Sequence, residues 1–268
     1  MKNILIIDAS YFIFYRYNAL LAWFKHSKQE ISDEIIKGND FLLKLEKRII
    51  HVLQELVKKY SAKIVIVCFD GHHNWRKNVL TTYKQNRKHT ETLLHSFKFA
   101  QKILNKYISE NDYYSFFNDN LEADDIVHFI ARKFANIEKT SITIIANDSD
   151  YIPLLKCNNI KIITLNGKPI RSPIKEDLPY FMLSKILSGD KSDNIPPVFP
   201  RCGKKTALKL AKNINELNKK LKSSLEWQQN FERNTILIDN QKIPNKYLKW
   251  LETQWALLSK KIFLKELK

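Results

Sequence analysis

Residues 3–8 read Asn-Ile-Leu-Ile-Ile-Asp, a short apolar run that stops at an aspartate. Similar runs rich in β-branched residues occupy 63–69, 141–146 and 160–165, and an aspartate closely follows the first two of these. Short apolar runs of this kind are typical of strands that are buried on both faces of a parallel sheet. The stretch at 3–8 therefore predicts the first strand of such a sheet.

Helical patterns separate the predicted strands. Apolar residues recur at helical spacing in 41–59, 92–107 and 122–134, and a short helix is expected at 204–212. Strands that alternate with helices indicate an α/β fold with a mostly parallel central sheet flanked by helices. In such sheets, ligands bind beyond the carboxyl ends of the strands.

Carboxylates gather at those strand ends in a chain that is strongly basic. Asp8, Asp70 and Asp148 each follow a predicted strand, whereas the chain has 45 Lys and Arg residues against 28 Asp and Glu residues, a net charge of +17. Acids that converge repel one another unless a cation neutralises them, and their oxygens suit Mg²⁺ or Mn²⁺. For each acid, the alternative is an ordinary helix cap or turn residue. The candidate metal ligands are Asp8, Asp70, Glu122, Asp124, Asp125, Asp148, Asp150, Asp190 and Asp193.

Two basic segments are candidates for contact with nucleic acid. Residues 75–88 combine Arg, Lys, Tyr and Trp, whose side chains contact phosphates or stack on bases. Gly203 precedes the predicted helix at 204–212, whose first backbone N–H groups are able to receive a phosphate. The alternatives are a solvated run of charge, a plain helix start and, for the net charge, a lysine-rich surface.

Cysteine spacing and hydropathy disfavour other classes of protein. Cys68, Cys157 and Cys202 lie far apart, which predicts reduced thiols and no zinc site. No run approaches the ~18 apolar residues of a membrane span. The N-terminus runs straight into Asp8 without the pattern of a signal peptide. We therefore expect a cytoplasmic protein that does not contact a membrane.

In their order along the chain, the candidate residues closely resemble the motifs of the flap endonuclease/5′–3′ exonuclease family, which includes the 5′-nuclease domain of bacterial DNA polymerase I. The residues that carry the resemblance are Asp8; Asp70; Arg76, Tyr83, Lys84 and Arg87; Glu122, Asp124 and Asp125; Asp148 and Asp150; and Gly189, Asp190, Asp193 and Asn194. The resemblance covers about residues 3–212. The phrase at 234–244 looks like that of the phage ribonuclease H members of the same family.

The resemblance implies a PIN/5′-nuclease-like organisation. The expected parts are an α/β metal-dependent nuclease core at 1–185, which includes a helical arch segment at about 74–100, then a helix-hairpin duplex-binding motif at 186–212, and a C-terminal helical region at 213–268 packed on the core.

The resemblance also implies a role for each matching residue. Two or more Mg²⁺ or Mn²⁺ ions are expected, the first held by Asp8, Asp70, Glu122 and Asp124 or Asp125, and the second by Asp148, Asp150, Asp190 and Asp193. Lys84 and Arg87, together with Asp8 and Asp70, are the expected catalytic residues. The expected nucleic-acid contacts are Arg76, Tyr83, Lys84, Arg87, Arg201, Gly203, Lys204, Lys205 and Thr206.

The chain departs from the family pattern at the hairpin turn. That turn usually carries two glycines, and here Arg201 replaces the first of them, ahead of Cys202-Gly203. We therefore do not expect the K⁺ ion that relatives often bind there, and Arg201 would contact phosphate instead.

The implied activity is that of a structure-specific 5′-nuclease, a 5′–3′ exonuclease and flap endonuclease of DNA replication or repair. The expected enzyme is a monomer that acts on DNA with a 5′ flap or a 5′ end. Removal of RNA primers from an RNA–DNA hybrid, and a single-strand-binding protein or sliding clamp as partner, stay open. The alternatives are a PIN-like ribonuclease, which would lack the arch and the hairpin, and a non-catalytic scaffold for branched DNA, which would lack some of the acids.

Overall fold

The chain forms two compact units in a computed structural model that describes residues 2–27, 32–171, 173 and 175–266. Unit 1 comprises Met1–His72, His89–Asn147 and Cys157–Ile170. Unit 2 comprises His73–Lys88, Asp148–Lys156 and Arg171–Lys268. Residues 73–88 and 148–156 group with 171–268 rather than with the sheet, and the domain boundaries expected from the sequence stay a prediction.

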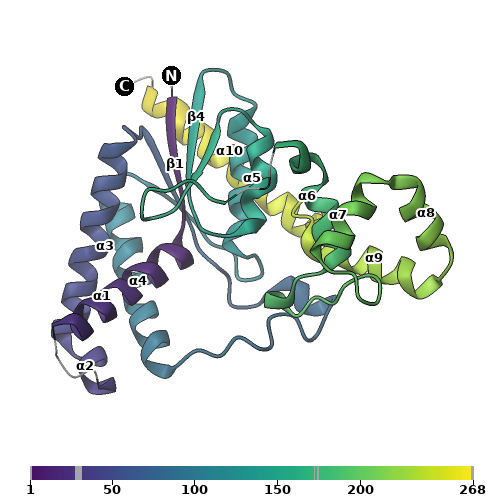
Figure 1. The fold of residues 1–268 in the computed structure, drawn as a ribbon. Coiled ribbons are helices and arrows are strands. Elements are labelled where there is room, and N and C mark those ends of the chain that lie inside the picture. Colours follow the sequence, from purple (N-terminus) through teal and green to yellow (C-terminus); the bar gives the residue numbers. More distant parts are fainter. Residues whose placement is uncertain (1, 28–31, 172, 174, 267–268) are drawn as a thin grey trace. The chain divides into compact units, whose positions relative to one another are not determined.

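Unit 1 is built on five parallel strands in the order β3-β2-β1-β4-β5 (Figure 1). The strands are β1 (Lys2–Asp8), β2 (Ile64–Cys68), β3 (Tyr114–Phe116), β4 (Thr140–Ile145) and β5 (Ile160–Ile163). The predicted α/β fold is thus confirmed, and the four apolar runs of the sequence form β1, β2, β4 and β5. The sequence did not predict β3, an edge strand of three residues whose burial changes at every position.

Helices cover both faces of this sheet (Figure 1). On one face, the helices α1 (Ala9–His26), α3 (Asn39–Lys59) and α4 (Glu91–Glu110) share an apolar core with Leu5 and Ile7 of β1. The short helix α2 (Asp33–Lys37) contacts α3 and α4. On the other face, α5 (Ala123–Ala135) contacts β1, β2 and β4. Successive side chains of a strand alternate between faces, which explains why every residue of the run at 4–7 is buried.

The strand register brings two of the predicted metal ligands to the same edge of the sheet. Asp8, the last residue of β1, lies opposite Cys68, the last residue of β2. Asp70 follows two residues later. Because parallel strands all end at one edge, Asp8 and Asp70 come to neighbouring positions there, as the alternation of strands and helices predicts.

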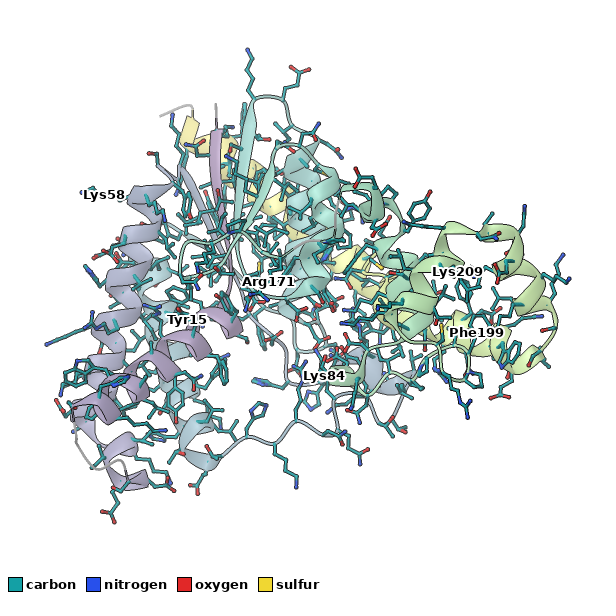
Figure 2. All side chains as sticks on the ribbon, in the orientation of Figure 1. Tyr15, Lys58, Lys84, Arg171, Phe199 and Lys209 are labelled. Carbon is teal, nitrogen blue, oxygen red and sulfur yellow. The ribbon has the colours of Figure 1, made fainter. Side chains whose placement is uncertain are left out.

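Unit 2 consists of helices and short 3₁₀ helices (η). Its elements are η1 (Trp75–Asn78), η2 (Ser149–Lys156), η3 (Lys175–Tyr180), α6 (Phe181–Ser188), η4 (Lys191–Asp193), α7 (Lys204–Lys212), α8 (Ile214–Lys222), α9 (Leu225–Ile238) and α10 (Asn245–Glu266). One small core gathers around Phe199, which Figure 2 labels, and a second joins Tyr83 to Ile186 and Leu237. The predicted helix at 204–212 is confirmed as α7.

The segment expected to form the arch divides between the two units. The part of this segment in unit 2 is residues 73–88. Its helical element is the four-residue η1, and turns and irregular backbone make up the rest. Regular helix begins only at Glu91, the start of α4 in unit 1. Of the helices that the structure describes in either unit, none has both the length and the apolar character needed to cross a membrane.

Candidate metal centres and nucleic-acid interface

In unit 1, Asp8 and Asp70 hold together the segments that follow β1 and β2. Asp8 caps α1, because its Oδ1 accepts a hydrogen bond of 3.0 Å from the backbone N–H of Tyr11. Asp70 accepts a hydrogen bond from the hydroxyl of Ser10 and another, of 2.7 Å, from the backbone N–H of Ala123. Asp70 therefore ties the first turns of α1 and α5 to the end of β2.

The acidic run that opens α5 forms a reciprocal cap. Oδ2 of Asp125 accepts a hydrogen bond of 3.2 Å from the backbone N–H of Glu122, and the Glu122 carboxylate accepts one from the backbone N–H of Asp125. Asp125 is fully buried, whereas Glu122 and Asp124 are partly exposed. The cap accounts for two of the three acids of this run, so their prediction as metal ligands stays a prediction.

The pKa of the Cys68 thiol is sensitive to the negative charge at this edge of the sheet. Burial raises the pKa of Cys68 well above its ordinary value, and the carboxylates of Asp8 and Asp70 raise it further. A region that disfavours a second anion favours a cation. The role of Asp8 and Asp70 as metal ligands stays a prediction.

In unit 2, three predicted ligands converge. Among the residues that the structure describes, Asp150, Asp190 and Asp193 form a group in which one carboxylate oxygen from each residue lies within 4.8 Å of the other two. We call these three residues the aspartate cluster. Asp148, the fourth predicted ligand, is exposed, and its Oδ1 accepts a hydrogen bond of 3.0 Å from the backbone N–H of Asp150. It therefore fixes the turn that carries Asp150.

A tight loop sets the position of Asp190 and Asp193. Gly189 adopts a φ of +65°, and a Cβ at this position would lie 2.4 Å from the carbonyl oxygen of Ile195, so that only glycine fits. The backbone of Asp190 pairs with that of Ile195, and the Asp190 carboxylate accepts a hydrogen bond of 2.9 Å from the backbone N–H of Ser192. The spacing Gly189-Asp190-x-x-Asp193 thus folds into a rigid corner.

Sequence reasoning missed the cation inside the aspartate cluster. The Nζ of Lys185, on α6, donates a hydrogen bond to Asp150 and lies 3.0 Å from Oδ2 of Asp190. Burial by itself would raise the pKa of Asp190, but the charge of Lys185 and hydrogen bonds from Lys185 and Ser192 outweigh it and lower that pKa to about 2. A lysine within the mostly apolar stretch 181–187 was the signal in the sequence that pointed to it.

Three residues of the basic segment contact the third acid of the cluster. Asp193 accepts a hydrogen bond of 3.1 Å from the Tyr83 hydroxyl and one of 2.7 Å from Nη2 of Arg87. The Nζ of Lys84, labelled in Figure 2, lies 3.7 Å from Oδ2 of Asp193. The backbone N–H of Lys84 also donates to the Asp193 carbonyl, at 3.0 Å. The predicted catalytic pair Lys84 and Arg87 is therefore brought to the predicted metal ligand Asp193.

Two other predicted nucleic-acid contacts face inward. Arg76 is 2% exposed; its Nε donates a hydrogen bond of 2.8 Å to the carbonyl of Leu237, and its Nη2 donates one of 3.2 Å to Asn240. Tyr83 is 3% exposed and belongs to a small apolar core. In this structure neither side chain is available to stack on a base or to grip a phosphate, and both attach residues 73–88 to the rest of unit 2.

The hairpin residues, by contrast, are exposed. Arg201, Gly203, Lys204, Lys205 and Thr206 all face solvent around the first turn of α7. Gly203 is the N-cap of α7 and supplies no side-chain hydrogen bond, and a Cβ built on it would meet nothing within 4 Å. The first N–H groups of the helix therefore open onto free space, which suits a phosphate.

The aspartate cluster fits a divalent cation. Its donors are hard carboxylate oxygens, the kind that Mg²⁺ and Mn²⁺ prefer. The Lys185 ammonium is already a stand-in for a cation between two of the acids. In unit 1, Asp70 accepts a hydrogen bond from the backbone N–H of Ala123, whose neighbours in sequence are Glu122 and Asp124. A second ion held by Asp8, Asp70 and these acids stays a prediction.

Comparison with known sequences identifies related nucleases. A family model described as 5′–3′ exonuclease, N-terminal resolvase-like domain, matches residues 3–178. A 5′–3′ exonuclease of Buchnera aphidicola is 29% identical over 228 residues, which are 80% of this chain and 68% of that protein. The ribonuclease H of Enterobacteria phage T4 is 26% identical over 202 residues, 68% of this chain and 66% of that protein. The chain thus spans about two thirds of the length of each of these relatives.

Comparison with solved structures identifies the same fold. A bacteriophage T5 flap endonuclease, crystallised as a pseudo-enzyme–product complex with DNA and metal ions, gives a TM-score of 0.62 at 21% identity and covers 89% of both chains. A T5 protein co-crystallised with metal ions gives a TM-score of 0.64 at 21% identity, over 89% of this chain and 90% of that one. At this level of identity, the likeness is one of fold.

Proposed function

This chain belongs to the 5′–3′ exonuclease/flap endonuclease family, and from that premise we propose that it is a metal-dependent, structure-specific 5′-nuclease. The observation that carries the proposal is the aspartate cluster. One carboxylate oxygen from each of its residues lies within 4.8 Å of the other two, and Asp193 contacts both Lys84 and Arg87. Acids that converge beside basic residues suit a divalent cation and an anionic substrate at once.

The proposed reaction is hydrolysis of a phosphodiester bond. The oxygen of a water molecule bonds to phosphorus, the bond from phosphorus to the 3′-oxygen breaks, and the leaving oxygen takes up a proton. The products are a 5′-phosphate and a 3′-hydroxyl. Bound Mg²⁺ or Mn²⁺ ions supply the chemistry that this reaction needs, by lowering the pKa of water and by offsetting negative charge on the phosphate.

Each unit contributes one set of ligands in this proposal. The aspartate cluster, with Asp148 behind it, would hold one ion. Asp8 and Asp70, with Glu122 and Asp124 or Asp125, would hold another. Asp70 is oriented for this role by its hydrogen bonds to Ser10 and Ala123, which leave its carboxylate little freedom to turn.

Lys84 and Arg87 would neutralise the charge that develops on the phosphate. Both contact Asp193, so they are held beside the cluster before a substrate arrives. Removing a positioned electrostatic group of this type costs about 10²–10³ in rate. The exposed first turn of α7 would bind a duplex through its phosphates and without reading bases.

The proposed substrate is DNA with a 5′ flap or a 5′ end, bound by a monomer. The T5 flap endonuclease, crystallised with DNA, supports this choice through its fold. The T4 ribonuclease H supports an RNA–DNA hybrid as a second substrate, because its sequence relationship is similar in extent to that of the exonuclease. Removal of RNA primers or DNA flaps during replication or repair would follow from either activity.

A panel of labelled substrates tests the proposal. We expect Mg²⁺-dependent cleavage of a 5′ flap and of an RNA–DNA hybrid, with less cleavage of plain single strands, and no cleavage in EDTA. The Asp150→Asn variant should lose cleavage while it keeps its affinity for the flap in EDTA. Asp177→Asn is the matched control, because it breaks an ion pair with Lys212 in the same unit but outside the cluster.

Four outcomes of this panel would reject the proposal. Cleavage that persists in EDTA, or full activity of Asp150→Asn, would remove the metal centre. Cleavage of single-stranded RNA without preference for a 5′ flap would indicate a PIN-like ribonuclease. Tight binding of the flap with no cleavage by any variant would indicate a DNA-binding scaffold.

A further inference from the structure

Lys185 is a charged side chain in an apolar setting. It lies in the middle of α6, and its side chain is only 11% exposed. The two residues that follow it, Ile186 and Leu187, are buried. Burial of an ammonium is unfavourable unless its charge and its hydrogen bonds are satisfied. The partners that satisfy Lys185 are the carboxylates of Asp150 and Asp190, which come from two other segments of unit 2.

We propose that Lys185 is an internal counter-ion of the aspartate cluster, and that a divalent cation has to displace its ammonium from Asp150 and Asp190 in order to bind. The inference rests on the proposed function for the identity of that cation, but not on the catalytic role of the cluster. Lys185 would thereby act as a positioning residue that stabilises the three converging carboxylates while the ion is absent.

Competition for the same oxygens is the first step of the argument. The ammonium lies 3.0 Å from Oδ2 of Asp190 and is hydrogen-bonded to Oδ1 of Asp150. Mg²⁺ binds carboxylate oxygen at about 2.0–2.1 Å and also keeps several waters, so it would need the space around the same two acids. A unit charge and a double charge of the same sign, held on adjacent oxygens, repel each other in this partly buried site.

Charge balance is the second step. The cluster carries three negative charges, and Arg87 and Lys84 contact Asp193 from the other side. Lys185 supplies the counter-charge for Asp150 and Asp190. A divalent cation at the same place would supply twice that charge, so the lysine is no longer needed once the ion is bound.

The backbone beside Lys185 is anchored by a buried side chain of α9. The carbonyl of Ile186, next to Lys185, accepts a hydrogen bond of 3.0 Å from the side-chain amide of Asn234 on α9. The same amide donates a second hydrogen bond, of 2.8 Å, to the carbonyl of Pro196. Asn234 is fully buried, so α6 is anchored immediately beside the lysine. The four-carbon side chain of Lys185 is then the part that is free to swing away.

Titration with Mn²⁺, followed by calorimetry and by the electron paramagnetic resonance of free Mn²⁺, tests the competition without any nuclease assay. Lys185→Met removes the charge and keeps most of the apolar side chain. We expect it to bind Mn²⁺ at the cluster at least about tenfold more tightly than the unmodified protein. Lys219→Met is the matched control: it removes one positive charge from an exposed site on α8 and should change the affinity less than about twofold. Asp190→Asn identifies the binding event, because the event assigned to the cluster should weaken in that variant.

The ammonium itself can be followed in the unmodified protein. In spectra that correlate the protons of lysine ammonium groups with ¹⁵Nζ, Lys185 should give a slowly exchanging signal, assigned by its loss in Lys185→Arg, which keeps the positive charge beside Asp150 and Asp190. Added Mg²⁺ should shift or abolish it. This measurement decides the question even if Lys185→Met does not fold.

The results separate this inference from the proposed function. Equal or weaker Mn²⁺ affinity in Lys185→Met, or a Lys185 signal that Mg²⁺ leaves unchanged while Mn²⁺ binds, would overturn the counter-ion role and leave the nuclease proposal intact. Failure of Mn²⁺ to bind the unmodified protein at all would reject both.

Discussion

The hydroxyl of Tyr83 donates a hydrogen bond of 3.1 Å to Oδ2 of Asp193, across 110 positions of the sequence. Both side chains are buried. The contact closes one end of the segment 73–88 onto the loop that carries the aspartate cluster, and Arg87 contacts the other oxygen of the same carboxylate.

The Tyr83→Phe variant measures what this hydrogen bond contributes. A hydrogen bond to a charged group contributes about 1.5–3 kcal/mol, and its loss leaves a buried carboxylate less well solvated. We expect the free energy of unfolding, measured in urea with EDTA present, to fall by about 1–2 kcal/mol. Tyr180→Phe removes the same atom from an exposed ring of the same unit and should have little effect. Equal effects of the two changes would show that the contact does not stabilise unit 2.

Arg76 is predicted to matter for stability rather than for binding. Its guanidinium is 2% exposed and donates to the carbonyl of Leu237 near the end of α9 and to the side chain of Asn240. Arg76→Ala should lower the free energy of unfolding by about 3 kcal/mol, because it leaves buried acceptors without their donor. Lysine should not rescue it, since it cannot reproduce the two separate hydrogen bonds.

The role that the family resemblance suggested for Arg76 makes the opposite prediction. If its guanidinium contacted a phosphate, Arg76→Ala would weaken flap binding and leave the unfolding transition in place. Arg171→Ala removes an exposed arginine from the same unit and controls for the loss of charge. Unfolding curves and flap binding, measured on the same three proteins, distinguish the two roles.

The sheet was readable from the sequence because β1 and β2 contain unbroken apolar runs and β4 is rich in β-branched residues. The helix α1 could not be predicted in this way, because its own apolar side chains lie on all sides of the helix. Phe12 and Tyr17 are buried, whereas Phe14 and Trp23 are exposed. No single apolar stripe marks it as amphipathic. The strand β3 is too short for a pattern to form.

The candidate site shows the same limit. The acids were predicted because they follow predicted strands and because of the order in which they occur along the chain. Both properties can be read directly from the sequence. The burial of Asp193 against Tyr83 depends on a contact between segments far apart in sequence. The same is true of the single lysine that contacts both Asp150 and Asp190. A buried Arg76 and an exposed Arg87 look alike in a basic run, because charge alone does not reveal which side chain meets a partner inside the protein.

Lys204 and Lys205 are predicted to bind duplex phosphates. Both are exposed in the first turn of α7, beside helix N–H groups that no side chain caps. Changing both to alanine should weaken duplex binding and reduce the slope of log K against log salt concentration by about 2, because each phosphate contact contributes about 0.9. The change Lys219→Ala with Lys222→Ala removes two exposed lysines from α8 and should alter the slope far less. The same slope change in both pairs would mean that net charge, and not the hairpin, governs binding.

Arg201 is predicted to affect stability and binding in opposite directions. It is exposed and adopts a φ of +57°, in the left-handed region where a side chain is unfavourable by about 1 kcal/mol. Arg201→Gly should remove that strain and raise the free energy of unfolding by up to about 1 kcal/mol, although the greater freedom of glycine in the unfolded chain offsets part of the gain. Arg171→Gly, at an exposed arginine outside the left-handed region, should only destabilise. If Arg201 also contacts phosphate, then Arg201→Gly should weaken duplex binding while it stabilises the fold. A variant that loses stability as Arg171→Gly does would show that the turn does not strain Arg201, and the reason for an arginine at this position would then have to be sought in binding alone.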